Sequence, residues 1–129
     1  MPGLPRKVLI VDDDKAVLDA LEFVLRLQGF EVHVYSSGAE LLADGEFGRA
    51  GCVIIDDSMP CMDGLQLIEQ LRARDISVPA ILITSHATDR LHARAAMAGV
   101  KVVLEKPFLE QALTASIQTI LDGGNERCA

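Results

Sequence analysis

Acidic, hydroxyl and basic side chains follow four separate apolar runs of this sequence. In chain order the groups are Asp12 to Asp14, Asp56 and Asp57, Thr84 and Ser85, and Glu105 to Pro107. Carboxylates held close together repel one another, and a proton or a cation relieves that repulsion. If the four groups meet, we predict that a hard divalent ion with oxygen ligands, together with Lys106, neutralises the charge of the carboxylates. For any single group, capping of the next helix explains the residues equally well, and for Asp14 we prefer it.

The apolar runs before these groups have the pattern of buried parallel strands. They are continuous rather than alternating, as expected of strands covered on both faces, and comprise Val8 to Val11, Cys52 to Ile55, Ala80 to Ile83 and Val102 to Leu104. The stretch from Val32 to Tyr35 alternates instead, which indicates a strand nearer an edge of the sheet.

Segments with helical periodicity alternate with these strands. Asp14 is predicted to cap a helix that ends near Gly29, and four more are expected over 39–43, 64–74, 89–98 and 110–121, the last ending at Gly123-Gly124. Five strands alternating with five helices predict a doubly wound α/β domain with a parallel sheet. Ligands bind at the shared carboxyl edge of such a sheet, so the four groups are expected to converge there.

Length and composition narrow the choice of partners. The chain has 129 residues, half of them apolar, which fits one domain with an aliphatic core. A net charge of −7 argues against direct binding to nucleic acid or to an anionic membrane surface, because both attract clustered basic residues. Three cysteines without a CxxC spacing indicate neither a disulfide framework nor a zinc site. The first apolar run is too short for a signal peptide, so a cytoplasmic location is expected.

Four motifs in this order resemble those of response-regulator receiver domains: VLIVDDD, VIIDDSMPCMDGLQL, ILITSHA and VVLEKPF. The resemblance covers about residues 6 to 122, and ITSH and EKPF are similar to receivers of the FixJ type. It implies a flavodoxin-like, CheY-like (βα)5 fold, a five-stranded parallel sheet in the order 2-1-3-4-5. It also implies a single receiver domain over 1–129 with a frayed tail from 123 to 129.

The resemblance implies a phosphorylation site with a metal ion. Asp56 would accept a phosphoryl group from a phosphohistidine on a sensor histidine kinase or a histidine phosphotransfer protein. Mg²⁺, or Mn²⁺, would be held directly by Asp13, Asp56 and the backbone carbonyl of Ser58, and by Asp12 through a water. The chain would catalyse its own phosphorylation and slow dephosphorylation, as a signalling domain rather than an enzyme with a separate substrate.

The resemblance also implies a switch. Lys106 would hold a phosphoryl oxygen, and its bond to Pro107 is typically cis in the family. Thr84 would reach another oxygen by moving inward, which shifts the surface of the fourth helix, fifth strand and fifth helix. The expected output is contact with a downstream protein, or phosphorylation-favoured self-association, through Thr88 to Leu109. No helix-turn-helix follows Leu121, so the chain is either a stand-alone receiver or a fragment.

Two residues depart from the family pattern. Val103 stands where many receivers have Tyr or Phe, which places the ring-coupled form of the switch in doubt. Asp57 adds a negative charge where an apolar residue is more usual. We interpret Asp57 as a solvated loop acid. The alternative is a carboxylate that points toward the site, favours metal and disfavours phosphate.

Three further positions are expected to tune the site. Ser85 is bulkier than the Ala or Gly often found after the switch Thr and would narrow access to Asp56. Ser58 and His86 occupy positions that set the lifetime of the phosphoryl group in the family, through the path of the attacking water. The methionines near these segments are interpreted as packing residues: Met59, Met62 and Met97.

Two other classes of function remain open. Asp12-x-Asp14 resembles the opening motif of haloacid-dehalogenase-type phosphatases, but that family needs a Thr or Ser soon afterwards, whereas Lys15-Ala16-Val17 follows here. A pseudo-receiver would keep the fold as a constitutive interaction module without phosphorylation, and Val103 with Asp57 leaves room for it.

Overall fold

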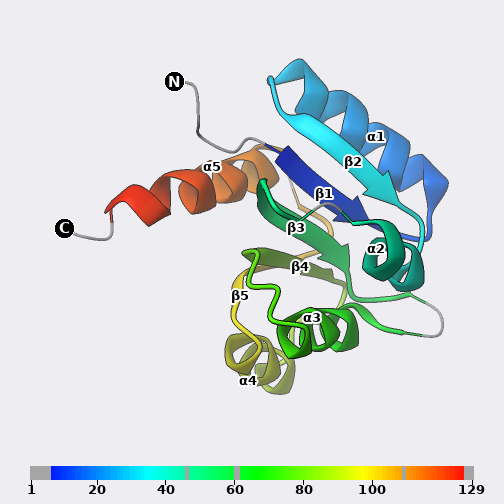
Figure 1. Cartoon of the computed structure of the whole chain (residues 1–129), viewed down its shortest axis with the longest axis vertical. Helices are drawn as coiled ribbons and strands as arrows, with labels where there is room; N and C mark the ends of the chain where they lie inside the picture. The colour runs from blue at the N-terminus through cyan, green and yellow to red at the C-terminus, as the bar shows by residue number, and fades with distance from the viewer. Residues whose placement is uncertain (1–6, 46, 60–61, 109, 127–129) are drawn as a thin grey trace.

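The computed structural model describes residues 7–45, 47–59, 62–108 and 110–126, with the backbone alone for residues 123–126. Strands and helices alternate along the described chain: β1 (Lys7–Val11), α1 (Lys15–Leu27), β2 (Glu31–Tyr35), α2 (Gly38–Asp44), β3 (Ala50–Asp56), α3 (Gly64–Ala73), β4 (Ala80–Thr84), α4 (Asp89–Met97), β5 (Val100–Glu105) and α5 (Glu110–Glu126). The strands form one parallel sheet in the order β2-β1-β3-β4-β5 (Figure 1). The predicted doubly wound α/β fold and its strand order are confirmed.

The two faces of the sheet are covered by different helices (Figure 1). On one face α1 and α5 contribute to an apolar cluster through Leu18, Leu25, Leu113 and Ile117. On the other face α2, α3 and α4 contribute to a second cluster through Leu41, Leu65, Leu67, Ile68, Leu71 and Ala95. The central strands are thus covered on both sides, which explains their continuous apolar runs.

Local hydrogen bonds and backbone conformation set both ends of α1 and the start of α3. Asp14 caps α1, because its side chain accepts a hydrogen bond from the backbone N–H of Ala16 at 3.0 Å. Asp63 caps α3 in a reciprocal capping box with Gln66. Gly29 follows α1 with a φ of 94°, a left-handed conformation that glycine adopts without steric cost. The predicted cap at Asp14 and the predicted end of the same helix near Gly29 are confirmed.

Two expectations about the C-terminal third of the chain are wrong. α5 does not end at Gly123-Gly124 but continues to Glu126, because glycine weakens a helix without forbidding its backbone conformation. Residues 127–129 lie outside the described residues, so the expectation of a frayed tail stays a prediction for them. β5 is an edge strand, so Val102, Val103 and Leu104 are only half-buried rather than enclosed on both faces.

Arg72, in the last turn of α3, fastens the end of α4 to the rest of the domain. Its guanidinium donates hydrogen bonds to the carbonyls of Ala98, Ile76 and Val78 at 2.8 to 2.9 Å, and to that of Gly99 at 3.4 Å. These carbonyls belong to the turns after α3 and α4. The C-terminal end of α4 is consequently fixed, while its other end adjoins the carboxyl edge of β4.

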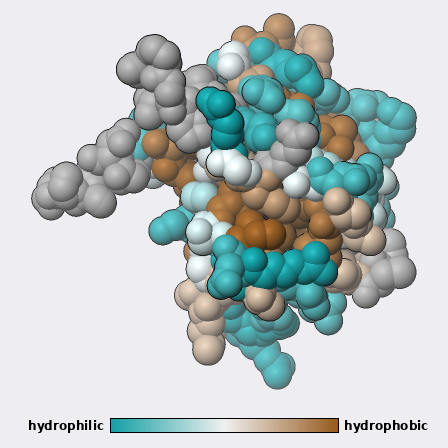
Figure 2. All heavy atoms as spheres, in the orientation of Figure 1, coloured by the Kyte–Doolittle hydropathy of each residue, from teal (hydrophilic) through white to brown (hydrophobic). Residues whose placement is uncertain are grey.

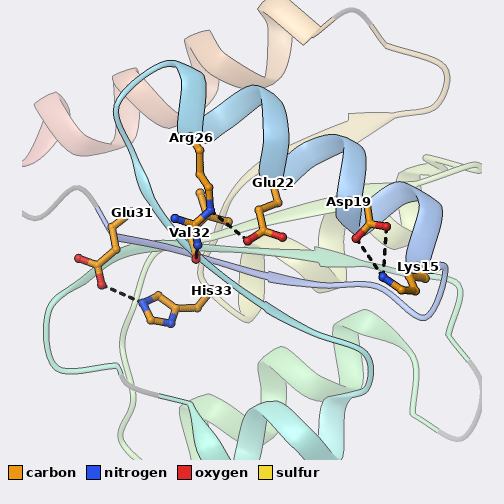
Figure 3. A network of polar contacts seen from close by, with 7 residues as sticks. All are labelled: Lys15, Asp19, Glu22, Arg26, Glu31, Val32 and His33. Atoms are coloured by element: carbon orange, nitrogen blue, oxygen red, sulfur yellow. Dashed lines mark hydrogen bonds and ion pairs between the residues drawn. The ribbon is translucent and has the colours of Figure 1, made fainter.

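Ion pairs on α1 and β2 lie at the surface (Figure 3). Lys15 pairs with Asp19, and His33 pairs with Glu31. Exposed pairs of this kind contribute little to stability. Arg26 pairs with Glu22 one turn earlier on α1 and also donates a hydrogen bond to the carbonyl of Val32 on the edge strand β2 at 2.7 Å.

The surface is a mixture of polar and apolar residues. In Figure 2 brown apolar residues lie among larger teal polar areas on the side that Figure 1 presents. Large apolar side chains that face water include Phe23, Leu27 and Met97, of which Met97 is 89% exposed. The interpretation of Met97 as a packing residue is therefore wrong, whereas Met59 and Met62 do pack against the core. Within the described part of the chain, every helix is too short or too polar to cross a bilayer.

Candidate functional site

Three carboxylates converge where the strand order reverses, between β1 and β3. The register pairs Val11 with Ile55, so the residues that follow β1 lie beside Asp56 at the end of β3. One carboxylate oxygen from each of Asp12, Asp13 and Asp56 lies within 4.8 Å of the others. Asp12 and Asp56 are buried, while Asp13 is exposed at the edge of the group. The structure thus brings together the acids that follow two different strands.

Asp56 is buried, and its two oxygens have different neighbours. Oδ1 lies 2.8 Å from the Nζ of Lys106, an ion pair that joins β3 to the end of β5. Oδ2 accepts a hydrogen bond from the backbone N–H of Ser58 at 3.2 Å. Apart from the ammonium, Oδ1 has no partner in hydrogen-bond geometry among the described residues. A carboxylate oxygen can accept more than one such interaction, so this carboxylate retains capacity for a further cation or electrophile.

Lys106 supplies the positive charge of the site. Its backbone N–H donates to the carbonyl of Thr84 at 2.8 Å, and its bond to Pro107 is cis, as the resemblance implied. The neighbouring carboxylate of Asp56 raises the pKa of the ammonium above its usual value, with smaller contributions from Asp12 and Asp14. The ammonium is therefore fully protonated at neutral pH and compensates part of the acid charge.

Burial, more than repulsion between the acids, disfavours the charged form of Asp12. Burial raises its pKa from 3.8 to about 6, and the charges of Asp56 and Asp13 add to the rise. A hydrogen bond from the backbone N–H of Asp14 at 2.9 Å, and the charge of Lys106, act in the opposite direction. The single ammonium of Lys106 thus does not neutralise all the negative charge of the acid cluster near neutral pH.

This pKa predicts a specific dependence of stability on pH. A folded-state pKa above the unfolded value means that folding takes up a proton, so the free energy of unfolding falls as pH rises from about 4 to about 6. The loss attributable to Asp12 is up to about 3 kcal/mol, at about 1.4 kcal/mol per pKa unit. Urea unfolding without divalent ions should show that the free energy of unfolding falls less with rising pH in Asp12→Asn than in the parent. Addition of Mg²⁺ should reduce the fall in the parent. Parallel pH profiles for parent and variant would contradict the assignment.

Thr84 does not contact Asp56 in this structure. Its side chain is buried, with 2% of the residue exposed. The Oγ1 accepts a hydrogen bond from the backbone N–H of His86 at 3.1 Å and lies 3.5 Å from the Oδ2 of Asp57. The hydroxyl of the expected switch residue is therefore turned toward Asp57.

Asp57 is not the solvated loop acid that we expected. It is half-buried, and burial raises its pKa, with further increases from the charges of Asp63 and Asp56. The backbone N–H of Leu65 and the hydroxyl of Thr84 lower it in part. Asp57 also stands outside the group of acids that could share a metal ion. The expectation failed because the backbone of Asp57 continues the sheet, with its N–H donating to the carbonyl of Ile83 at 2.7 Å.

The remaining predicted site residues surround this group. Ser58, Ser85 and His86 are exposed beside it, and Val103 is half-buried against the cluster under α3 and α4. The backbone N–H of Ser58 is directed to Asp56, while the proposed role of its carbonyl stays a prediction. Cys61 lies outside the described residues.

Gly64 allows α3 to begin directly against the phosphoacceptor candidate. A Cβ at this position would lie 2.6 Å from the carbonyl oxygen of Asp56 and 2.9 Å from the Cγ2 of Ile55. Gly64→Ala is expected to lower the free energy of unfolding by about 1–3 kcal/mol, as overpacked sites do. Gly48→Ala is the matched control, because a Cβ there meets nothing within 4 Å. Urea unfolding of both variants measures this, and equal stabilities would show that no close approach exists.

The donor set fits a small hard cation. The acids offer three carboxylate oxygens from adjacent strand ends, without thiolate or imidazole among them. Mg²⁺ prefers such oxygen ligands and retains several waters, so a partly exposed acid such as Asp13 suits it. The raised pKa of Asp12 and the remaining acceptor capacity of the Asp56 carboxylate both indicate that added positive charge would stabilise the group.

Comparison with known proteins gives a consistent result. The family model described as "Response regulator receiver domain" matches residues 8–118. The chain is 36% identical to the transcriptional regulatory protein PrrA of Mycobacterium tuberculosis, covering 89% of this chain and 49% of that protein. It is 34% identical to the transcriptional regulatory protein FixJ of Azorhizobium caulinodans, covering 93% and 57% respectively. The chain thus spans about half the length of the curated relatives it matches.

Solved structures with the same fold include a response regulator receiver domain protein and FixJ-N. A CheY-like response regulator receiver domain protein from Methanospirillum hungatei aligns with a TM-score of 0.86 at 28% identity, covering 95% of this chain and 98% of that one. The structure titled FixJ-N aligns with a TM-score of 0.81 at 33% identity, covering 90% and 93%. The likeness therefore extends over almost the whole domain.

Proposed function

The chain belongs to the response-regulator receiver family, and we propose that it is a phosphoacceptor domain of a two-component phosphorelay. In this proposal Asp56 takes a phosphoryl group from a phosphohistidine on a sensor histidine kinase or a histidine phosphotransfer protein. The observation that carries the proposal is the buried Asp56 carboxylate, flanked by Lys106 at 2.8 Å and by the two acids that follow β1. The family match favours this reading over the haloacid-dehalogenase-type phosphatase.

The residues of the chain would act mainly by position and charge. A bond forms between a carboxylate oxygen of Asp56 and phosphorus, while the bond from phosphorus to the histidine nitrogen breaks and the imidazole leaves with the electron pair. The Lys106 ammonium is placed to balance negative charge on the phosphoryl oxygens. The backbone N–H of Ser58 orients the attacking carboxylate. The transfer requires no general base, because the attacking carboxylate oxygen, unlike a hydroxyl, has no proton that must be removed.

A divalent ion, Mg²⁺ or Mn²⁺, is part of the proposal. Asp13, Asp56 and the carbonyl of Ser58 would hold it directly, and Asp12 through a water. When bound, it supplies charge neutralisation for the phosphoryl oxygens.

The proposed output is a change in the surface formed by α4, β5 and α5. Thr84 would turn from Asp57 toward the phosphoryl group. Because α4 is the next element after β4, this movement would be passed to the N-terminal end of α4. The C-terminal end of α4 would stay in place, since Arg72 holds it. The partner would be a downstream protein or, in the phosphorylated state, a second copy of the chain. The cytoplasmic location usual for the family belongs to the same proposal.

A phosphoryl-donor assay tests the proposal against its alternatives. The chain is incubated with acetyl phosphate, with Mg²⁺ or with a chelator, and the protein-bound and released phosphate are followed. A base-labile protein phosphate that requires Mg²⁺ supports the receiver. If the protein is never phosphorylated, the result would favour the constitutive interaction module. Rapid hydrolysis of a free phosphate ester without stable protein phosphate would favour a phosphatase.

A further inference from the structure

Asp57 and Thr84 face each other on the opposite side of the sheet from Asp56. Side chains alternate along β3, so that Cys52 and Ile54 pack with α1 and α5, while Val53 and Ile55 pack with α2, α3 and α4. Asp56 continues the first series and Asp57 the second. Thr84 follows Leu82 of β4, which packs in the same cluster as Ile55. The register places Asp56 opposite Ile83, and hence Asp57 opposite Thr84.

Backbone hydrogen bonds hold the main chain of Asp57 between β4 and α3. The N–H of Asp57 donates to the carbonyl of Ile83 at 2.7 Å, and the carbonyl of Asp57 accepts from the N–H groups of Met59 and Gly64, both at 3.2 Å. These bonds tie the residue to β4 and to the start of α3. The carboxylate lies beside Thr84 and also accepts a hydrogen bond from the backbone N–H of Leu65, a partner independent of the Thr84 hydroxyl.

The Thr84 hydroxyl has one proton and two competing acceptors. Its oxygen already accepts from the N–H of His86 at 3.1 Å, and its proton is directed to the Oδ2 of Asp57 at 3.5 Å. Thr84 is 2% exposed, so water is a poor substitute for that partner. A hydroxyl that donates to a phosphoryl oxygen on Asp56 cannot at the same time donate to Asp57.

We infer that Asp57 is a positioning residue that holds the Thr84 hydroxyl away from Asp56 and so opposes the phosphorylated conformation. The inference rests on the proposed function and adds a residue to its switch. Asp57 lowers the population of the conformation in which Thr84 reaches the phosphoryl group, and the phosphoryl oxygen must displace it. Phosphorylation therefore shifts an equilibrium that Asp57 biases toward the unphosphorylated state.

The test is a double-variant cycle on binding of beryllofluoride, a phosphoryl mimic, in the presence of Mg²⁺. Asp57→Val removes the acceptor and the charge, Asp57→Asn removes the charge but keeps an acceptor oxygen, and Thr84→Val removes the hydroxyl with little change of shape. Apparent affinities are measured by NMR titration for the parent, the single variants and the Asp57→Val, Thr84→Val pair. Urea unfolding confirms that each variant folds.

The gain in affinity from Asp57→Val is expected to be about fivefold larger when Thr84 is present than when Val replaces it, the size of one ordinary hydrogen bond, because the contact between Thr84 and Asp57 is long at 3.5 Å. Asp57→Asn should gain less than Asp57→Val, because its amide oxygen still accepts. The Thr84 methyl resonance of free Asp57→Val should move toward its beryllofluoride-bound position. These results would support the inference.

Other results would overturn it. Equal gains in the two Thr84 backgrounds would show that Asp57 acts through charge alone. Equal gains from Asp57→Asn and Asp57→Val, with an unmoved Thr84 methyl resonance, would show the same. If the parent failed to bind beryllofluoride at Asp56, the proposed function would fall and this inference with it, so the two failures are distinguishable.

Discussion

Asp56→Asn is expected to abolish stable phosphorylation of the chain by acetyl phosphate and Mg²⁺. The amide has the shape of the carboxylate but is not a nucleophile, so incorporation should fall by at least roughly a thousandfold. The backbone N–H of Ser58 can still bond to the amide oxygen, which keeps the loop in place. Intact-protein mass spectrometry measures the modified fraction directly.

Asp57→Asn is the matched control for this variant. It alters the adjacent acid, which is also partly buried but faces the other side of the sheet. The control should be phosphorylated at least as well as the parent, because the acceptor is intact. Full modification of Asp56→Asn would place the acceptor elsewhere, and loss of modification in the control alone would assign it to Asp57.

Lys106→Met should lower the rate of phosphorylation by about 100-fold to 1000-fold, as removal of one group that stabilises developing negative charge does. Methionine retains the length of the side chain, while the positive charge 2.8 Å from Asp56 is lost. The time course of modification by acetyl phosphate at saturating Mg²⁺ gives the rate. The acceptor remains, so slow modification of Asp56 should still reach a detectable level.

Lys101→Met serves as the control for Lys106→Met. Lys101 is an exposed lysine on the same strand, β5. Its removal changes the net charge by the same amount without touching the acid cluster. Comparable rate losses in the two variants would mean that general electrostatic attraction of the donor, rather than contact with Asp56, explains the effect.

The convergence of the acids was predictable because it follows from the parallel sheet. Continuous apolar runs identified the strands, and a shared carboxyl edge then placed Asp12, Asp13, Asp56 and Lys106 together without any knowledge of side-chain rotamers. The cap at Asp14 was predictable for a similar reason, since it depends on a local hydrogen bond.

The orientation of individual polar side chains was not predictable from the sequence. Asp57 looked like a loop acid, but a bond to the carbonyl of Ile83 extends the sheet past the end of β3 and turns its carboxylate toward Thr84. Arg72 gave no signal either, because its four carbonyl partners belong to turns that only the tertiary fold brings together. Such contacts depend on tertiary geometry that periodicity does not encode.

Localisation of the phosphoryl group by peptide mapping tests the central claim most directly. Cleavage after Arg49 and Arg72 releases a peptide with three candidate aspartates, Asp56, Asp57 and Asp63. After modification with Mg²⁺ and conversion of the acyl phosphate to a stable derivative, fragmentation of the peptide should assign the label to Asp56 alone, and a chelator should prevent labelling. A label on another residue, or equal labelling of Asp56 without a divalent ion, would contradict the account.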